Sequence, residues 1–220
     1  LNAMAYVHGN VLMNVEDWEG LEDELLKSAT KVYARAKELN AMVTYDSIGV
    51  GAFVGSKFAD LNAMNPGGWQ IEYDAFNAGS KVHEPEEIFM ELPHVSILNK
   101  EYFANIKAQK WTEIAERFRK TFEYANGDSD YDTDELISID TDGWSDQDVE
   151  VFLFELSAPR KDVDLTGKFK VESKKDMRKR GVKSPNKADA AIMALMKPIR
   201  APSGFFDFLS LIHISEPTRL

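Results

Sequence analysis

The chain contains no cysteine and only four histidines in 220 residues. The absence of cysteine excludes a disulfide scaffold, a thiol nucleophile and a cysteine-ligated zinc or iron–sulfur site. The histidines are scattered and form no His-x-x-x-His pair, which argues against a histidine-built zinc site. No apolar run approaches the roughly 18 to 20 residues that a membrane-spanning helix needs. A bound metal would therefore use oxygen ligands, and the chain has 37 Asp and Glu residues.

Acidic and basic side chains are unevenly distributed along the chain, whose formal net charge is −11. Residues 128–167 contain thirteen acidic and two basic residues, whereas residues 168–187 contain nine basic and two acidic residues. The average charge argues against a nucleic-acid binder, but electrostatic fields in salt solution act locally, within about 10 Å. The basic segment 168–187 is therefore able to bind a polyanion despite the acidic average.

Hydrophobic periodicity predicts alternating strands and helices. Apolar runs at residues 3–7 and 11–15 flank the turn His8-Gly9-Asn10 and predict a β-hairpin. Further strands are expected at residues 41–45, 69–73 and 167–171. Helices are expected at residues 18–39, 99–125, 147–157 and 186–197, and another from the glycine turn at residues 49–51 to about residue 62. Residues 77–98 are expected to be rich in loops. This order predicts an α/β fold with a mixed sheet.

Two aspartates lie where α/β proteins place their functional groups. Asp46 ends the strand predicted at residues 41–45 and precedes Gly49-Val50-Gly51, so its carboxylate is expected in the crevice at the carboxyl edge of the sheet. Asp189 lies in the first turn of the last predicted helix, among alanines that allow close packing on the sheet. Taken singly, such acids are more often turn formers or helix N-terminal charges.

A basic segment directly precedes Asp189. Such a run is usually a solvated surface, but beside two acids it suits metal-dependent phosphodiester chemistry. Mg²⁺ and Mn²⁺ prefer carboxylate oxygens, and two such ions, roughly 3.5–4 Å apart, activate a water and neutralise the leaving oxygen. We therefore predict Asp46 and Asp189 as catalytic metal ligands. The residues predicted to bind DNA are Lys174, Lys175, Arg178, Lys179, Arg180, Lys183 and Lys187.

Three segments, in this order, resemble the nuclease domain of the large terminase subunit of tailed bacteriophages. They are Tyr45-Asp-Ser-Ile-Gly-Val-Gly-Ala52, Asn99 to Trp111 with Arg117-Phe118, and Glu172-Ser-Lys-Lys-Asp-Met-Arg-Lys-Arg-Gly181 followed by Ser184-Pro-Asn-Lys-Ala-Asp-Ala190. The resemblance implies a ribonuclease H-like fold that cuts concatemeric phage DNA through an acid cluster binding two divalent metals, Mg²⁺ or Mn²⁺. Asp46 and Asp189 match two of the family's acids.

The resemblance also implies partners and a location. The expected partner is double-stranded phage DNA, in the cytoplasm of the host cell during phage assembly. In the intact family proteins an ATPase domain precedes the nuclease domain, and the small terminase subunit and the portal are further partners; no membrane is involved. These expectations come from the family and not from the composition of the chain.

The chain departs from the family pattern at both ends. The family's first acid lies on a central strand that precedes the hairpin, whereas this chain begins at the hairpin. We therefore expect residues 1–200 to form an N-terminally truncated nuclease domain that lacks its first, central strand and has little or no activity. Residues 201–220 are expected to be a tail, and residues 209–219 resemble a translated sequencing adapter, so we exclude them from the predicted fold.

Two other functions fit parts of the sequence. The pattern Gly49-x-Gly51-x-x-x-Gly55 follows a strand and precedes a helix, and Asp74 lies about 20 residues further on, which imitates a dinucleotide-binding fingerprint. Against this, the spacing is one residue longer than the common motif, and Asp46 would repel a pyrophosphate. The second alternative is a non-catalytic DNA-binding module that uses the basic segment alone.

Overall fold

A six-stranded mixed sheet forms the centre of the computed structural model, which describes residues 2–20, 24–48, 51, 53–196 and 207–214. The strand order is β4-β3-β10-β1-β2-β7. These strands are β1 (Asn2–His8), β2 (Val11–Trp18), β3 (Ala41–Asp46), β4 (Tyr73–Phe76), β7 (Ser138–Ile139) and β10 (Asp207–Ile214). The mixed α/β class predicted from the sequence is therefore confirmed.

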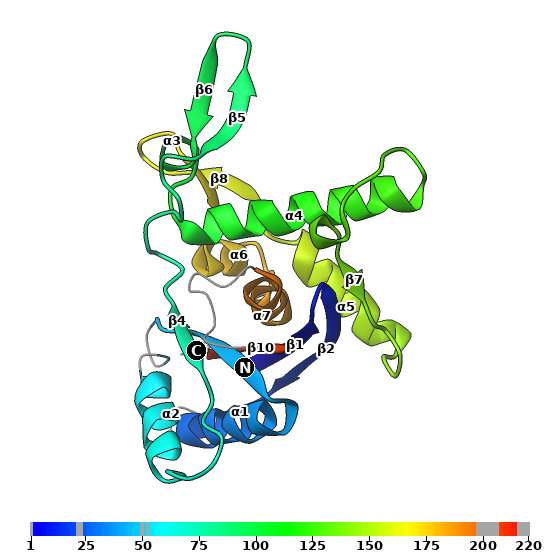
Figure 1. Cartoon of the computed structure of the whole chain (residues 1–220). Coiled ribbons are helices and arrows are strands. Elements are labelled where there is room, and N and C mark those ends of the chain that lie inside the picture. The colour runs from blue at the N-terminus through cyan, green and yellow to red at the C-terminus, as the bar shows by residue number, and fades with distance from the viewer. Residues whose placement is uncertain (1, 21–23, 49–50, 52, 197–206, 215–220) are drawn as a thin grey trace.

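Helices cover both faces of the sheet (Figure 1). Helices α1 (Leu25–Leu39) and α2 (Val54–Ala63) lie on one face. Helix α7 (Asn186–Leu195) lies on the other, and α4 (Ile106–Ala125) and α5 (Asp146–Ser157) pack against it from outside. None of the described helices is long and apolar enough to cross a membrane.

Each face of the sheet has its own hydrophobic core. On one face, Phe58 of α2 is fully buried and its ring contacts Tyr33, Tyr45 and Tyr73. On the other face, α7 is buried along nearly its whole length, and the small side chains of Ala188, Ala190 and Ala191 belong to this core. Helix α7 lies directly on the sheet and contacts β1, β2, β3 and β10.

Two small hairpins project from the helical layer above α7. One consists of β5 (Ile88–Leu92) and β6 (Val95–Leu98), and the other of β8 (Lys161–Val163) and β9 (Phe169–Val171). Helix α3 (Asn99–Tyr102) follows the first hairpin, and helix α6 (Lys174–Lys179) follows the second. The prediction of a loop-rich stretch at residues 77–98 thus missed a strand pair.

Several predicted elements are confirmed, and three have different boundaries for local reasons. The helix predicted from residue 18 begins at Leu25, because Trp18 ends β2 and its indole N–H donates to Ser28 Oγ (2.9 Å). The long helix predicted from residue 99 is broken before Ile106, where Asn105 caps α4 by accepting the Ala108 N–H (3.0 Å).

The strand predicted at residues 69–73 lies instead at Tyr73–Phe76. The side chain of Asn62 explains the shift, because it bonds both backbone groups of Ile71. The Ile71 N–H donates to Asn62 Oδ1 and the Asn62 amide donates to the Ile71 carbonyl, both at 3.0 Å. Ile71 therefore has no backbone group left for a strand ladder.

The central position of the sheet, which we expected to be empty, is held by β10. This strand pairs antiparallel with β1 and parallel with β3. Strand β10 includes residues 209–214, which we expected to lie outside the fold. The physical reason is that an empty centre would leave two strand edges with unpaired backbone groups, and an apolar segment that reaches this position satisfies both.

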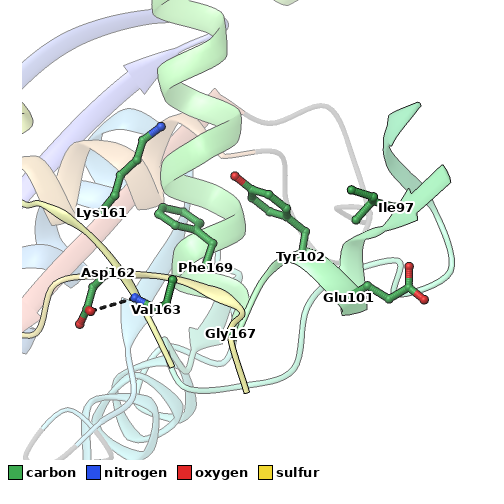
Figure 2. Close-up of a pocket in the computed structure, with 8 residues that line it drawn as sticks. All are labelled: Ile97, Glu101, Tyr102, Lys161, Asp162, Val163, Gly167 and Phe169. Carbon is green, nitrogen blue, oxygen red and sulfur yellow. Dashed lines mark hydrogen bonds between the residues drawn. The ribbon is translucent and has the colours of Figure 1, made fainter. Parts of the chain in front are cut away.

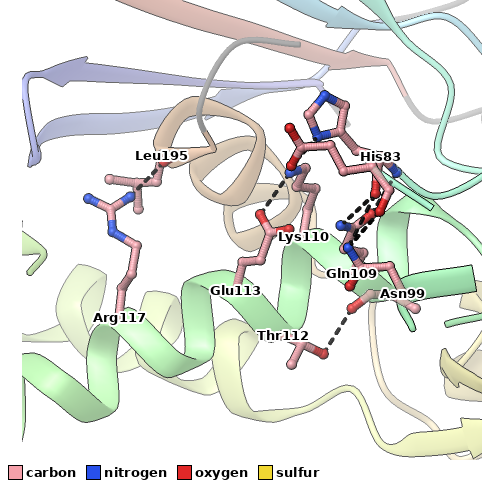
Figure 3. Close-up of polar contacts among 10 residues, drawn as sticks. His83, Asn99, Gln109, Lys110, Thr112, Glu113, Arg117 and Leu195 are labelled. Atoms are coloured by element: carbon pink, nitrogen blue, oxygen red, sulfur yellow. Dashed lines mark hydrogen bonds and ion pairs between the residues drawn. The ribbon is translucent and has the colours of Figure 1, made fainter. Parts of the chain in front are cut away.

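Arg117 of α4 links several elements of the fold, and Figure 3 shows its hydrogen bond to Leu195. Its guanidinium donates to the carbonyl of Leu195 at the end of α7 (2.8 Å), to Asn10 Oδ1 (2.7 Å) and to the carbonyl of Leu136 (2.9 Å). Burial lowers the pKa of Arg117, although the nearby acids oppose this effect. One side chain thus links α4, α7, the β1–β2 turn and the segment before β7.

We expect Arg117→Met to lower the free energy of unfolding by about 3 kcal/mol, because three acceptors lose a charged donor. Urea denaturation followed by circular dichroism measures this. Arg119→Met is the matched control: Arg119 lies on the same helix and is exposed, and its ion-pair partners among the described residues are Glu116 and Glu123. The control should change the free energy of unfolding little. Equal effects of the two variants would contradict the role of Arg117 in linking these elements.

Candidate active site at the Asp46 and Asp189 carboxylates

Asp46 is the last residue of β3 and is buried, with 8% of its surface exposed. Its Oδ1 accepts the backbone N–H of Ile48 (3.0 Å), so the carboxylate also shapes the turn that follows the strand. That turn comes close to the strand end: a Cβ atom at Gly51 would lie 1.9 Å from the Asp46 carbonyl oxygen. Glycine is thus required at position 51 for packing, which accounts for this residue without any bound nucleotide.

Asp189 lies in the first turn of α7 and is 6% exposed. Two lysines from other elements neutralise it. Lys107 Nζ, from the first turn of α4, lies 2.8 Å from Asp189 Oδ1, and Lys174 Nζ, from the first turn of α6, lies 3.2 Å from Oδ2. Three helices therefore meet at one buried carboxylate.

The two aspartates belong to one electrostatic cluster. Burial raises the pKa of Asp46; the Ile48 N–H and the charge of Lys174 oppose this rise, and the charge of Asp189 adds to it. Burial would also raise the pKa of Asp189, but Lys107 and Lys174 together outweigh it and hold that pKa below its usual range. Burial lowers the pKa of Lys174 against the attraction of Asp189. The charge of Asp189 therefore acts on Asp46, and both aspartates interact with Lys107 and Lys174.

The donor set fits a hard divalent cation. Asp189 Oδ2 is buried and has no aligned hydrogen-bond partner among the described residues. Mg²⁺ and Mn²⁺ are commonly held by one or two carboxylates together with water and phosphate oxygens. Within the described part of the chain, however, no group of three or more His, Cys, Asp or Glu side chains is arranged to hold a metal. The pair therefore suits one cation, and a second would need a further acid.

Strand β10 does not supply that acid by its register. Its only acidic residue is Asp207, which pairs with Ala41, at the opposite end of β3 from Asp46. The strand therefore completes the backbone pairing of the sheet without bringing a carboxylate to the level of Asp46.

The seven basic residues predicted to bind DNA fall into two groups. Four are engaged in ion pairs: Lys174 with Asp189, Lys179 with Asp176, Arg180 with Glu172, and Lys187 with Asp17. The other three, Lys175, Arg178 and Lys183, are exposed and form no ion pair among the described residues. Only this second group offers uncompensated charge on the surface next to α6.

Lys107 is a site residue that the sequence-based list of site residues omitted. Its signal is a lysine in the first turn of a helix, where the helix dipole disfavours a cation. Such a placement indicates that a nearby anion compensates the cost, and here the anion is Asp189. Lys107 Nζ also lies 5.6 Å from the centre of the Trp111 ring, one helical turn further along.

A pocket of about 570 Å³ lies away from the acid pair, between the two projecting hairpins (Figure 2). Tyr102 and Phe169 line it with aromatic rings whose centroids lie 5.9 Å apart, and Lys161 and Asp162 also line it. Neither Asp46 nor Asp189 lines it. Its lining mixes apolar and charged side chains and contains none of the predicted site residues.

Comparison with solved structures assigns the fold to a known type of domain. No protein-family profile and no curated protein matches the chain. The fold is that of the nuclease domain of the large terminase subunit of bacterial virus Sf6. A point mutant of that domain with manganese superposes with a TM-score of 0.72 at 23% identity, covering 88% of this chain and 82% of that one.

Two related structures agree with this match. The same type of mutant with calcium has 23% identity and a TM-score of 0.72, and the nuclease domain without that substitution has 22% identity and a TM-score of 0.72. Each covers 88% of this chain and 81% of the other. At such identities the likeness assigns the fold, and function has to be argued from the site.

Asn substitutions of the two aspartates should change stability in opposite directions at neutral pH. Asp189→Asn should lower the free energy of unfolding by roughly 3 kcal/mol, because two lysines lose a buried partner. Asp46→Asn should raise it, because the charge is penalised by burial while the amide oxygen still accepts the Ile48 N–H. Urea denaturation at several pH values measures both effects.

The pH dependence of these effects has a definite sign. The folded pKa of Asp189 is depressed, so its stabilising contribution is complete above the unfolded pKa and is lost as the pH falls through the folded pKa. The folded pKa of Asp46 is raised, so the gain from Asp46→Asn should shrink on acidification. Shifts of the same sign in both variants at pH 7 would refute this description of the cluster.

Proposed function

We propose that this chain is the nuclease domain of a phage large terminase subunit, with a ribonuclease H-like fold, and that the intact protein cuts concatemeric DNA with divalent metal ions. The observation that carries the proposal is the buried Asp46 and Asp189 pair with two lysines balancing its charge, at the meeting point of β3 and α7. The shared fold with a manganese-containing terminase nuclease supports the same reading.

Under this proposal, the aspartates bind the metal ion and the neighbouring lysines interact with the DNA. Asp46 and Asp189 would hold the cation, and burial keeps competing water away from their oxygens. When bound, Mg²⁺ or Mn²⁺ supplies Lewis acidity and lowers the pKa of its water. Lys107 and Lys174 neutralise Asp189 in the metal-free protein, and their ammonium groups would attract the phosphate of a bound DNA strand.

The complete two-metal reaction requires a further acid, which the family carries on its first strand. Because β10 brings no acid to the level of Asp46, we propose that this chain binds one ion and cuts DNA slowly or not at all. The alternative of a non-catalytic DNA-binding module shares this inactivity but predicts no specific metal site.

Isothermal titration calorimetry with Mn²⁺ tests the metal site directly. The 220-residue chain should bind Mn²⁺, and Asp46→Asn and Asp189→Asn should each weaken binding by at least about tenfold. Asp74→Asn is the matched control, because Asp74 lies on the neighbouring strand β4 but outside the cluster. Unchanged Mn²⁺ affinity in either site variant would remove that residue from the metal site.

Cleavage of a supercoiled plasmid in the presence of Mn²⁺ tests the activity. Little or no cutting is expected from this chain, and robust cutting would contradict the need for a further acid. In a longer protein that contains this chain and cuts DNA, Asp46→Asn and Asp189→Asn should abolish cutting while DNA binding remains roughly intact. Retained cutting in either variant would exclude that aspartate from the reaction.

The exposed group Lys175, Arg178 and Lys183 should carry DNA binding. Replacing all three by alanine should lower the affinity for duplex DNA. The slope of log Kd against log salt concentration should fall by about 2.7, because each lost phosphate contact lowers it by about 0.9. Fluorescence anisotropy with labelled duplex DNA at several salt concentrations measures this.

A charge-matched control for that experiment lies on the other face of the sheet, on α1. Replacing Lys27, Arg35 and Lys37 by alanine removes the same charge from a different surface. This control should leave the salt dependence unchanged. Equal loss in both triple variants would mean that net charge, and not the surface next to α6, attracts the DNA.

A further inference from the structure

Helix α7 begins without a capping side chain of its own. Its N-cap residue is Pro185, whose side chain has no hydrogen-bond acceptor. The backbone N–H of Asn186 donates to the Ser184 carbonyl (2.9 Å) and that of Asp189 donates to the Pro185 carbonyl (2.8 Å). The N–H groups of Lys187 and Ala188 remain, and buried N–H groups at a helix start need acceptors.

Glu155 of α5 supplies the acceptor. A single oxygen, Glu155 Oε2, accepts the N–H of Lys187 (2.7 Å) and the N–H of Ala188 (3.1 Å). The two residues are 32 and 33 positions away in the chain, so this is a cap between two helices. A carboxylate is well suited to the task because the N-terminus of a helix carries partial positive charge.

The position of Glu155 is itself fixed by packing. Three residues before it, Phe152 is almost completely buried in the core that contains α7, and its ring meets that of Trp144 at 5.5 Å. On the other side of the helix start, Lys187 Nζ pairs with Asp17 Oδ1 of β2 (3.1 Å). The turn that carries Asp189 is therefore fixed by contacts from two separate elements.

We propose that Glu155 is a positioning residue for Asp189. The two capped N–H groups belong to the residues directly before Asp189, so losing the cap frees the backbone that aims this carboxylate between Lys107 and Lys174. The inference rests on the proposed metal site. It assigns a function to a residue of the acidic segment 128–167, which by its charge alone resembles a solvated surface.

The test compares Glu155→Ala, which removes the acceptor, with Glu155→Gln, which keeps one acceptor oxygen. Glu150→Ala is the control, because Glu150 lies on the same helix, is acidic and is exposed. Mn²⁺ affinity is measured by calorimetry on the full chain, and amide exchange at Lys187 and Ala188 is measured without metal. Unfolding by urea is followed in parallel.

We expect Glu155→Ala to weaken Mn²⁺ binding by about tenfold and to accelerate exchange of both amides, while Glu155→Gln stays within about threefold of the wild type. Glu150→Ala should change neither quantity. If Glu155→Ala does not fold, Glu155→Asp tests the proposal instead. This variant keeps the negative charge, but its side chain is one methylene shorter, so the carboxylate no longer reaches the two N–H groups. That variant should fold and lose Mn²⁺ affinity.

Two outcomes would overturn the proposal: wild-type Mn²⁺ affinity in Glu155→Ala or Glu155→Asp despite faster amide exchange, or unchanged exchange at Lys187 and Ala188. Absence of Mn²⁺ binding by the wild-type chain is a different result. It would reject the metal site itself, whereas the exchange measurement would still report whether Glu155 holds the start of α7.

Discussion

The carboxylate of Asp189 is the interaction on which the site depends. A lone buried carboxylate would cost several kcal/mol, and it is tolerated here because Lys107 and Lys174 provide two compensating charges. These lysines come from α4 and α6, so the charge balance requires three helices to converge at one point. Two ammonium groups carry the same formal charge as one divalent cation, so the carboxylate is compensated in the metal-free protein.

Helix α7 is held at both ends by side chains from the helices that cover it. Arg117 of α4 donates to the carbonyl of Leu195 at the C-terminal end, and Glu155 of α5 accepts two N–H groups at the N-terminal end. A helix buried along its length cannot satisfy its terminal backbone groups with water. The covering helices therefore provide these partners, and in doing so they define where Asp189 lies relative to β3.

Strand β10 completes the hydrogen bonding of the sheet but brings no acidic residue near Asp46. Strand β10 fills the central position, so the backbone pairing of the sheet is continuous from β4 to β7. Its register, however, places Asp207 opposite Ala41, far from the end of β3. Backbone pairing depends little on side-chain identity, so an apolar segment suffices to complete a sheet. The metal site proposed here would need a further carboxylate near Asp46, and the register of β10 places Asp207 beside Ala41 instead.

The sequence by itself determined the elements whose signal is local. The hairpin around Gly9, the strand that ends at Asp46 and the helix that carries Asp189 all follow from periodicity and turn residues, and both aspartates were proposed as site residues from these positions. Contacts between distant segments left no such signal. Lys107, Glu155, the bonds of Asn62 to Ile71 and the placement of β10 were decided only by the tertiary structure, because each depends on which groups packing brings together and leaves in need of a partner.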